Sequence, residues 1–385
     1  MTYLDHNATT PVRPEVVDAM LPWLREGFGN PSSVYALGQR ARAAVEKARE
    51  RTAALIGAAD ASEIVFTSGG SESDVLALAG AAWQAHDESQ GRRRKIVTSR
   101  IEHDAIRLLG SQLRRRGFEV VEIGCGADGA VSAADMAAAI DDATAVVSLM
   151  HANNETGVLQ PVAEAAAAAR AKGALAHTDA VQSLGKMPVD VKALGVDLLA
   201  LSGHKLNAPK GVGALYVRRG VRLAPLITGH QEKNRRGSTE NVAGIVALGL
   251  ACELAAAELS AAAAHALALR RRIEAGVLRI PGARLNGHPE LRLPNTAHFS
   301  LAGLDGHHLV VALDLEGVCV SSGPACSSGA STPSHVLTAM GVDPKLATAS
   351  IRVSVGWGTT DADADRFLAI LPKAVERLRA AAVPA

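Results

Sequence analysis

Short apolar segments alternate with helical segments between about residues 60 and 220, and this alternation restricts the possible folds more than any other feature. The apolar segments span residues 63–67, 95–99, 118–123, 145–150, 174–177, 196–201 and 214–217. Strands that alternate with helices form mostly parallel sheets with helices on both faces. The sequence therefore predicts an α/β domain.

The pattern changes after residue 241. Helices are expected to fill most of residues 242–280, and strands at 296–301, 318–320 and 351–355 interleave with further helices. This arrangement indicates a second, smaller α+β unit. A run of serine, glycine and alanine at 321–331 surrounds Cys326, so both a buried thiol and an exposed, reactive one stay open.

Composition excludes several classes of protein. The chain has 385 residues, 48% of them hydrophobic and 21% charged, with a formal net charge of +1. This balance gives no reason to expect nucleic acid or an anionic membrane as a partner. The first residues lack a secretory signal pattern, and no uninterrupted apolar stretch of about 18 residues occurs. We expect a cytoplasmic protein with free cysteines and no metal site, because the four cysteines show no metal-ligand spacing.

Lys205 directly follows the predicted strand 196–201, in the sequence Ser202-Gly203-His204-Lys205. Burial disfavours the charged ammonium, and a neutral amine can condense with an aldehyde such as that of pyridoxal phosphate (PLP). The alternative is a lysine that reaches solvent at a strand end, which is the usual case for a single lysine.

A glycine turn, Ser68 to Ser73, joins the strand 63–67 to an apolar helix. The unpaired amides and the dipole at the start of a helix can bind a phosphate. A plain capping turn, with Ser71 or Ser73 as N-cap, explains the same residues equally well.

Polar side chains also follow three other predicted strands: His103, Asn153 with Asn154, and Asp179. The carboxyl edge of an open α/β sheet is where such proteins bind ligands. A carboxylate at position 179 could pair with the ring nitrogen of a cofactor and keep it protonated. Helix capping and turn formation are the structural alternatives for all of these residues.

A series of short motifs along the chain indicates a protein family. They are Tyr3-Leu4-Asp5 with Ala8-Thr9-Thr10-Pro11, Asn30-Pro31-Ser32-Ser33, Thr67-Ser68-Gly69, Glu102-His103, Asn153-Asn154-Glu155, Asp179 with Gln182, Ser202-Gly203-His204-Lys205, Thr239-Glu240-Asn241, Ser321-Ser322-Gly323 with Ala325-Cys326, and Ile351-Arg352-Val353-Ser354. With these motifs the chain resembles, from end to end, the cysteine desulfurases of the class V aminotransferase group, which are PLP enzymes of fold type I.

The resemblance implies a fold and a domain division. A large PLP-binding domain, residues 13–257, would contain a mostly parallel, seven-stranded sheet between helices. Residues 1–12 and 258–385 would form a smaller α+β domain that carries the cysteine loop, residues 319–333.

The resemblance also implies roles for site residues. Lys205 would carry the cofactor and move protons, Cys326 would be the nucleophile, and His103 would stack on the cofactor ring and assist in acid/base steps. Asp179 would pair with the ring nitrogen and Gln182 with the ring oxygen. Asn154 and Arg352 would bind the substrate carboxylate. The phosphate would be held by Gly70, Ser71, Ser202 and His204, and by Thr239 from the other subunit of a homodimer.

The implied reaction converts L-cysteine to L-alanine and leaves a persulfide on Cys326. A sulfur-acceptor or scaffold protein in iron–sulfur cluster assembly or thio-modification would take up the sulfur. The alternatives are a selenocysteine lyase, another class V transaminase or lyase, and a degenerate copy that only binds a partner. Some positions depart from the usual family pattern: Tyr35, Gly70-Ser71, Asp74, Ser238 and Pro324.

Overall fold

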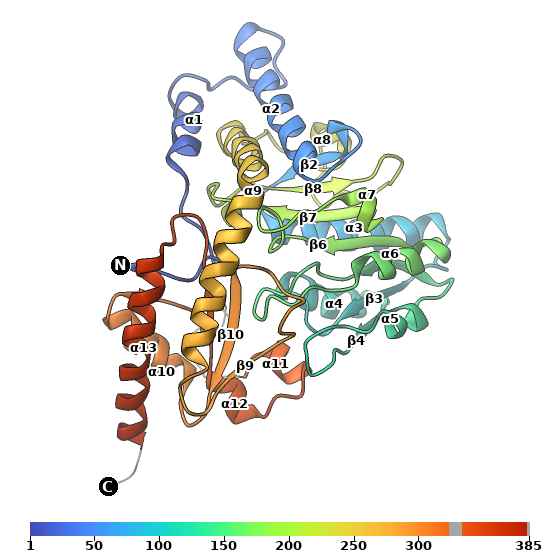
Figure 1. Cartoon of the computed structure of the whole chain (residues 1–385). Helices are drawn as coiled ribbons and strands as arrows, with labels where there is room; N and C mark the ends of the chain where they lie inside the picture. Colours follow the sequence, from blue (N-terminus) through green and yellow to red (C-terminus); the bar gives the residue numbers. More distant parts are fainter. Residues whose placement is uncertain (323–332, 383–385) are drawn as a thin grey trace.

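The computed structural model describes residues 1–322 and 333–382. Its largest element is a seven-stranded sheet in the order β2-β8-β7-β6-β5-β3-β4 (Figure 1). The strands are β2 (Ile64–Thr67), β3 (Lys95–Ser99), β4 (Glu119–Ile123), β5 (Thr144–Ser148), β6 (Leu175–Asp179), β7 (Leu198–Ser202) and β8 (Gly213–Val217). All seven were predicted, to within two residues at each end. Within this sheet β8 alone runs antiparallel to its neighbours, β2 and β7.

Helices cover both faces of this sheet. On one face, α3 (Gly70–Glu88) and α4 (Asp104–Arg115) share a core with Ile96 of β3. The next residue, Val97, faces the opposite core. That core includes α1 (Pro14–Arg25), α2 (Ala36–Leu55), α5 (Ala133–Ala139), α6 (Val162–Ala171), α7 (Val191–Leu194) and the first half of α9 (Val242–Val277). Side chains of a strand alternate between faces, so each apolar strand fills both cores.

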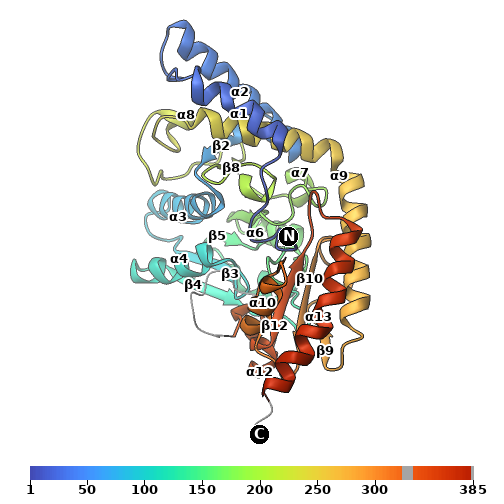
Figure 2. The same ribbon diagram turned by 90° about the vertical axis from the view of Figure 1, so that its left-hand side faces the viewer.

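A smaller unit is built around β10 (Thr296–Leu301), which pairs antiparallel with β9 (Ala283–Leu285) and β12 (Ser350–Ser354). Its own core also contains the second half of α9. Its helices are α10 (Gly306–Leu315), α11 (His335–Ala339), α12 (Pro344–Thr348) and α13 (Asp361–Ala382). Figure 2 shows α13 and α9 side by side next to this sheet. The predicted second α+β unit is confirmed, although β9 was not foreseen.

The amino terminus joins the smaller unit. Two-residue strand β1 (Thr2–Tyr3) pairs parallel with β11 (Val318–Cys319), and Asp5 bridges to Ser354 of β12. Strands this short leave no alternation in the sequence, so β1 was not foreseen. The domain boundaries at residues 12/13 and 257/258 stay a prediction.

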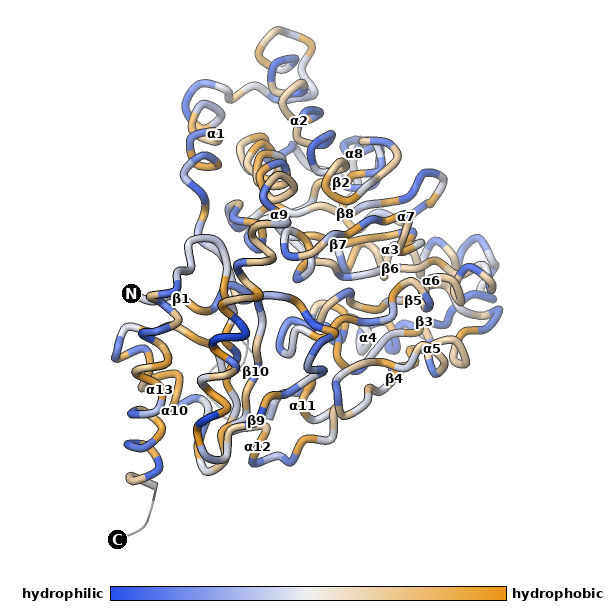
Figure 3. The backbone as a smooth tube through the Cα atoms, viewed as in Figure 1, coloured by the Kyte–Doolittle hydropathy of each residue, from blue (hydrophilic) through white to orange (hydrophobic). Residues whose placement is uncertain are grey.

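One continuous helix, α9, replaces the several helices expected between residues 242 and 280. Asn241 caps it by accepting a hydrogen bond from Gly244 N at 3.1 Å. By length and composition α9 is apolar enough to cross a membrane (Figure 3), yet half of its most apolar stretch is buried inside the protein. Its apolar residues therefore serve two cores of one folded chain.

The polar segment before α9 is tied to the large sheet. It contains the short helix α8 (Gln231–Asn234), and Glu232 pairs with buried Arg49 of α2 at 2.7 Å. The same carboxylate accepts a hydrogen bond from Phe66 N of β2 at 3.1 Å. This buried pair holds the segment against the edge of the sheet.

Close packing of α9 on α2 generates a stability prediction. A Cβ atom on Gly249 would lie 2.6 Å from Ala48 Cα. Gly249→Ala should lower the free energy of unfolding by about 1–3 kcal/mol because of this overlap. In Gly110→Ala, the matched control in α4, the new Cβ meets Val120 Cγ1 at 3.4 Å, and helix propensity should make it neutral or stabilising. Urea unfolding of both variants checks this, and equal effects would contradict it.

His298 generates a pH prediction. It is buried in β10 against Asn286 Nδ2 at 3.0 Å, and burial followed by the charges of Arg352 and Arg292 lowers its pKa to about 3. The folded state keeps His298 neutral, while the unfolded chain binds a proton below pH ~6.5. Stability is therefore lost as the pH falls from that value towards 3, by about 1.4 kcal/mol per pH unit.

The slope of unfolding free energy against pH reports how many more protons the unfolded chain binds than the folded one. The variant His298→Asn should lower that number by about one. His307→Asn, at an exposed position in α10, is the control and should leave the slope unchanged. Denaturant unfolding between pH 4.5 and 6 measures both, and an unaltered slope in His298→Asn would refute the assignment.

Candidate active site

A cavity of about 280 Å³ opens at the carboxyl ends of the parallel strands β3, β5, β6 and β7. The chain continues from β3 to β4 on one side and places β5, β6 and β7 on the other, so the cavity lies at a topological switch point. Ten of the twelve predicted site residues line it: Gly70, Ser71, His103, Asn154, Asp179, Gln182, Ser202, His204, Lys205 and Arg352. Residues that are distant in the sequence therefore meet at the carboxyl edge of the sheet, which is where the sequence predicted a ligand site.

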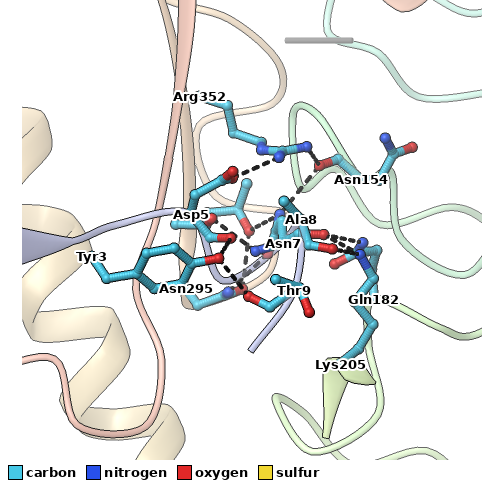
Figure 4. A network of polar contacts seen from close by, with 12 residues as sticks. Tyr3, Asp5, Asn7, Ala8, Thr9, Asn154, Gln182, Lys205, Asn295 and Arg352 are labelled. Carbon is cyan, nitrogen blue, oxygen red and sulfur yellow. Dashed lines mark hydrogen bonds and ion pairs between the residues drawn. The ribbon is translucent and has the colours of Figure 1, made fainter. Parts of the chain in front are cut away.

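Lys205 ends the short 3₁₀ turn Gly203–Lys205 that follows β7. Its side chain is half-buried, and the amine donates hydrogen bonds to the carbonyls of Asn7 and, at 2.6 Å, Ala8 (Figure 4). The amine thus points into the cavity and not into open solvent. This position argues against a lysine that simply reaches solvent, and the role of Lys205 in binding PLP stays a prediction.

The first turn of α3 forms another wall. Gly69 is the N-cap and no side chain caps the helix, so the interpretation of Ser71 or Ser73 as N-cap was wrong. Ser73 instead bonds Thr67 Oγ1 at 2.8 Å and Gly69 O at 3.2 Å. Gly70 has no room for a side chain, since a Cβ there would lie 2.8 Å from Val181 Cγ2. An uncapped terminus of a 19-residue helix can bind an anion.

Three buried carboxyl groups gather beside the cavity: Asp74, Glu102 and Asp179. Burial raises the pKa of each of them, and for Glu102 to about 8. Asp179 accepts one hydrogen bond from Val181 N at 2.8 Å, and the charges of His103 and Lys205 act in the opposite direction on its pKa. A protonated ring nitrogen is the kind of partner that would stabilise Asp179 as a carboxylate.

Two histidines of the site are held in defined orientations. His103 is the N-cap of α4, and its Nδ1 accepts from Ala105 N at 3.2 Å, which leaves Nε2 to carry the proton of the neutral ring. His103 therefore has both the capping role and a place in the cavity. His204 contacts Thr9 Oγ1 at 3.1 Å, and burial, Lys205 and Lys210 lower its pKa to about 4. His204 is thus a neutral hydrogen-bonding group at pH 7.

Arg352 reaches the cavity from β12 of the smaller unit and is 1% exposed. Its guanidinium donates to Asn154 O at 2.9 Å and to Asp5 Oδ1 at 2.8 Å (Figure 4). Arg352 Nε and Asn154 Oδ1 are buried without a hydrogen-bond partner in the described part of the chain. Unpaired buried polar atoms of this kind indicate a site for a polar ligand.

Two predicted residues are not among those that line the cavity. Thr239 is found with Ser68 and Arg236 around a separate hollow, so its action in the partner's site stays a prediction. Cys326 lies outside the described residues. Before it in the chain, the backbone of Ser321 pairs with that of Arg352 at 2.7 and 3.1 Å, and after it His335 lines the cavity.

The sequence analysis missed two polar residues, Asn7 and Lys186. Asn7 lines the cavity, and Lys186 is a half-buried lysine whose amine contacts Gln182 Oε1 at 3.0 Å. Burial, followed by the charges of Lys205 and Arg352, lowers the pKa of Lys186 well below its ordinary value. Lys186 is four residues after Gln182, a spacing that allows two side chains to meet on one turn of chain. That spacing alone did not single out Lys186, because it does not directly follow a predicted strand.

No group of three His, Cys, Asp or Glu side chains in residues 1–322 and 333–382 is arranged to hold a metal ion. In the same part of the chain Cys125, Cys252 and Cys319 are free thiols.

Comparison with known proteins identifies the family. Aminotransferase class-V matches residues 2–367. "Cysteine desulfurase IscS" of Methanosarcina thermophila is 46% identical over 98% of this chain and 92% of its own length. "Cysteine desulfurase" of Gluconacetobacter diazotrophicus is 47% identical over 98% and 94%.

Solved structures agree with these sequence relatives. A "NifS-like protein" superimposes with a TM-score of 0.91 at 37% identity, over 98% of this chain and all of that one. DndA from Streptomyces lividans gives 0.77 at 38% identity, over 92% and 99%. The chain therefore belongs to the aminotransferase class-V family, and within it to the cysteine desulfurases.

Proposed function

We propose that this protein is a PLP-dependent cysteine desulfurase that removes sulfur from L-cysteine, forms L-alanine and leaves a persulfide on Cys326. One observation carries the proposal. The amine of Lys205 lies in a cavity that also holds the guanidinium of Arg352, and the residues flanking the Cys326 segment, Ser321 and His335, are attached at that cavity. An amine, a carboxylate-binding group and a nucleophile are the three parts that this reaction needs.

The residues present fit PLP. The uncapped start of α3 suits its phosphate, buried Asp179 suits a protonated ring nitrogen, and unpaired Asn154 Oδ1 and Arg352 Nε leave polar atoms for a ligand. The residues that would hold the cofactor are Lys205 at the aldehyde, Asp179 at the ring nitrogen, Gln182 at the ring oxygen, His103 against the ring, and Gly70, Ser71, Ser202 and His204 at the phosphate. Bound PLP supplies an electron sink for negative charge that develops at the substrate α-carbon.

The remaining steps belong to the chain's own residues. Arg352 binds the substrate carboxylate with its planar guanidinium fork, and Asn154 supports it. Lys205 removes the α-proton and later returns a proton to the carbon skeleton. The thiolate of Cys326 attacks the substrate sulfur, so an S–S bond forms and the carbon–sulfur bond breaks. The carbon fragment keeps the electron pair of that bond and is protonated to alanine.

We also propose the surroundings in which this chemistry occurs. The enzyme would act in the cytoplasm as a homodimer in which Thr239 of one subunit reaches the phosphate site of the other. The position of Thr239 outside its own chain's cavity supports this arrangement. The partner would be a sulfur-acceptor or scaffold protein in iron–sulfur cluster assembly or thio-modification, since a persulfide on Cys326 needs an acceptor for its sulfur.

The nucleophile can be tested directly. Cys326→Ala should keep the absorbance of bound PLP and lose alanine and sulfide production, because no thiolate remains to take the sulfur. Cys319→Ala is the matched control: Cys319 is a partly exposed free thiol shortly before the same segment, and its loss should have no effect. After incubation with L-cysteine, mass spectrometry should find an added sulfur on the peptide that contains Cys326. Desulfuration by Cys326→Ala would refute the assignment.

The role of Arg352 can be tested by Arg352→Lys, which keeps the charge and removes the bidentate fork. The kcat/KM for L-cysteine should fall by roughly 10–100-fold, the effect of losing a hydrogen bond to a charged group. Arg292→Lys is the control, since Arg292 is another buried arginine of the smaller unit that lies outside the cavity. Steady-state kinetics compare the two variants, and the absorbance of bound PLP checks that each of them still holds the cofactor. Equal losses would point to a structural effect.

A further inference from the structure

Lys186 lies behind the cavity and is not among the residues that the mechanism uses. It lines a second cavity, of about 430 Å³, together with His6, Asn295 and Lys205. Lys205 borders both cavities. Lys186 is half-buried, and a lysine that is withdrawn from solvent usually pairs with a carboxylate.

The amine of Lys186 contacts amide oxygens only. It donates to Gln182 Oε1 at 3.0 Å and to Asn7 Oδ1 at 3.3 Å. No ion pair joins it to an acidic side chain in the described part of the chain. Lys186 therefore does not neutralise a buried carboxylate.

These contacts determine which way two side-chain amides face. An amide has one accepting end and one donating end. Asn7 Oδ1 accepts from Lys186 and from Asn295 Nδ2 at 3.1 Å, which turns Asn7 Nδ2 towards Thr296 Oγ1 at 2.9 Å and Asn154 O at 3.2 Å. Figure 4 shows Asn7 at the centre of this network.

The same argument applies to Gln182. Its Oε1 is occupied by Lys186, and one N–H of its Nε2 donates to Asn7 O at 3.1 Å. Because Gln182 lines the cofactor cavity, the second N–H of Nε2 is the group left for a ligand there. With the amide turned round, Gln182 would offer a carbonyl oxygen instead.

We propose that Lys186 is a positioning residue that holds Gln182 with an N–H donor towards the ring oxygen of PLP. This inference rests on the proposed function, because PLP is the ligand that Gln182 would meet. Burial lowers the pKa of Lys186, and a lysine amine remains a hydrogen-bond donor in either protonation state. The contact with Gln182 therefore persists across the working pH range.

The test is a pH titration of the visible absorbance of the PLP-loaded enzyme without cysteine. An N–H donor stabilises the deprotonated ring oxygen, so removing it weakens that form. Lys186→Met should move the midpoint of the absorbance transition upward by about one pH unit, a tenfold change in the equilibrium. Lys186→Arg, which restores a donor, should bring the midpoint back towards that of the parent. Lys192→Met, at an exposed lysine nearby in the sequence, is the matched control and should not move it.

A double-mutant comparison separates positioning from a general structural effect. In a Gln182→Ala background, Lys186→Met should no longer shift the midpoint, because the two residues act through one contact. If Lys186→Met does not fold, Gln182→Glu keeps an acceptor for Lys186 but lacks the N–H donor, and it should raise the midpoint by itself.

The outcomes are distinguishable. A parent protein that stays colourless with PLP would overturn the proposed function. A coloured parent whose Lys186→Met variant keeps its midpoint, or shifts it equally in the Gln182→Ala background, would overturn only the inference about Lys186. An upward shift that disappears in that background supports it.

Discussion

The hydrogen bonds of one asparagine side chain and its peptide hold the site together. Asn7 N donates to Ser354 Oγ of the smaller unit at 2.9 Å, while Asn7 O accepts from Gln182 and Lys205 of the large sheet. The residue is 1% exposed, so each of these bonds replaces water that is absent. The turn that contains Asn7 is therefore bonded both to the smaller unit and to residues that follow β6 and β7. Those residues and Arg352 of β12 line one cavity.

Charged groups of both signs gather around the cavity. Arg352 and Asp5 form an ion pair at 2.8 Å, while the amine of Lys186 contacts an amide oxygen. The pKa of Glu102, near 8, leaves it protonated at neutral pH, and its Oε1 then accepts from Ser99 Oγ and Met150 N. Under the proposed function, the phosphate and the protonated ring nitrogen of PLP would bring charges that complement these groups.

The sequence was sufficient for most of the fold. Continuous apolar runs such as 145–150 and 214–217 identified the strands, because strands covered on both faces need apolar residues throughout. Polar residues after these strands, such as His103, Asp179 and Lys205, indicated where a site would lie. Gln182, His204 and Arg352 entered through the family resemblance. Strands β1 and β9 were missed because two or three residues carry no periodicity. The single helix α9 was read as several because its composition, rich in alanine, gives no clear amphipathic face. Lys186 and Asn7 were missed because their roles depend on contacts between residues 175 or more positions apart, such as that of Gln182 with Asn7. The role of Cys326 rests on the sequence resemblance alone.

The length of α9 has a mechanical consequence. A helix of 36 residues is about 54 Å long, and its two halves belong to two different cores. Backbone hydrogen bonds run on from one half of the helix to the other, so separating the two units would require α9 to bend or break. A single element therefore helps to fix how the large sheet and the smaller sheet are aligned, and that alignment brings Arg352 to the cavity at the ends of β3, β5, β6 and β7.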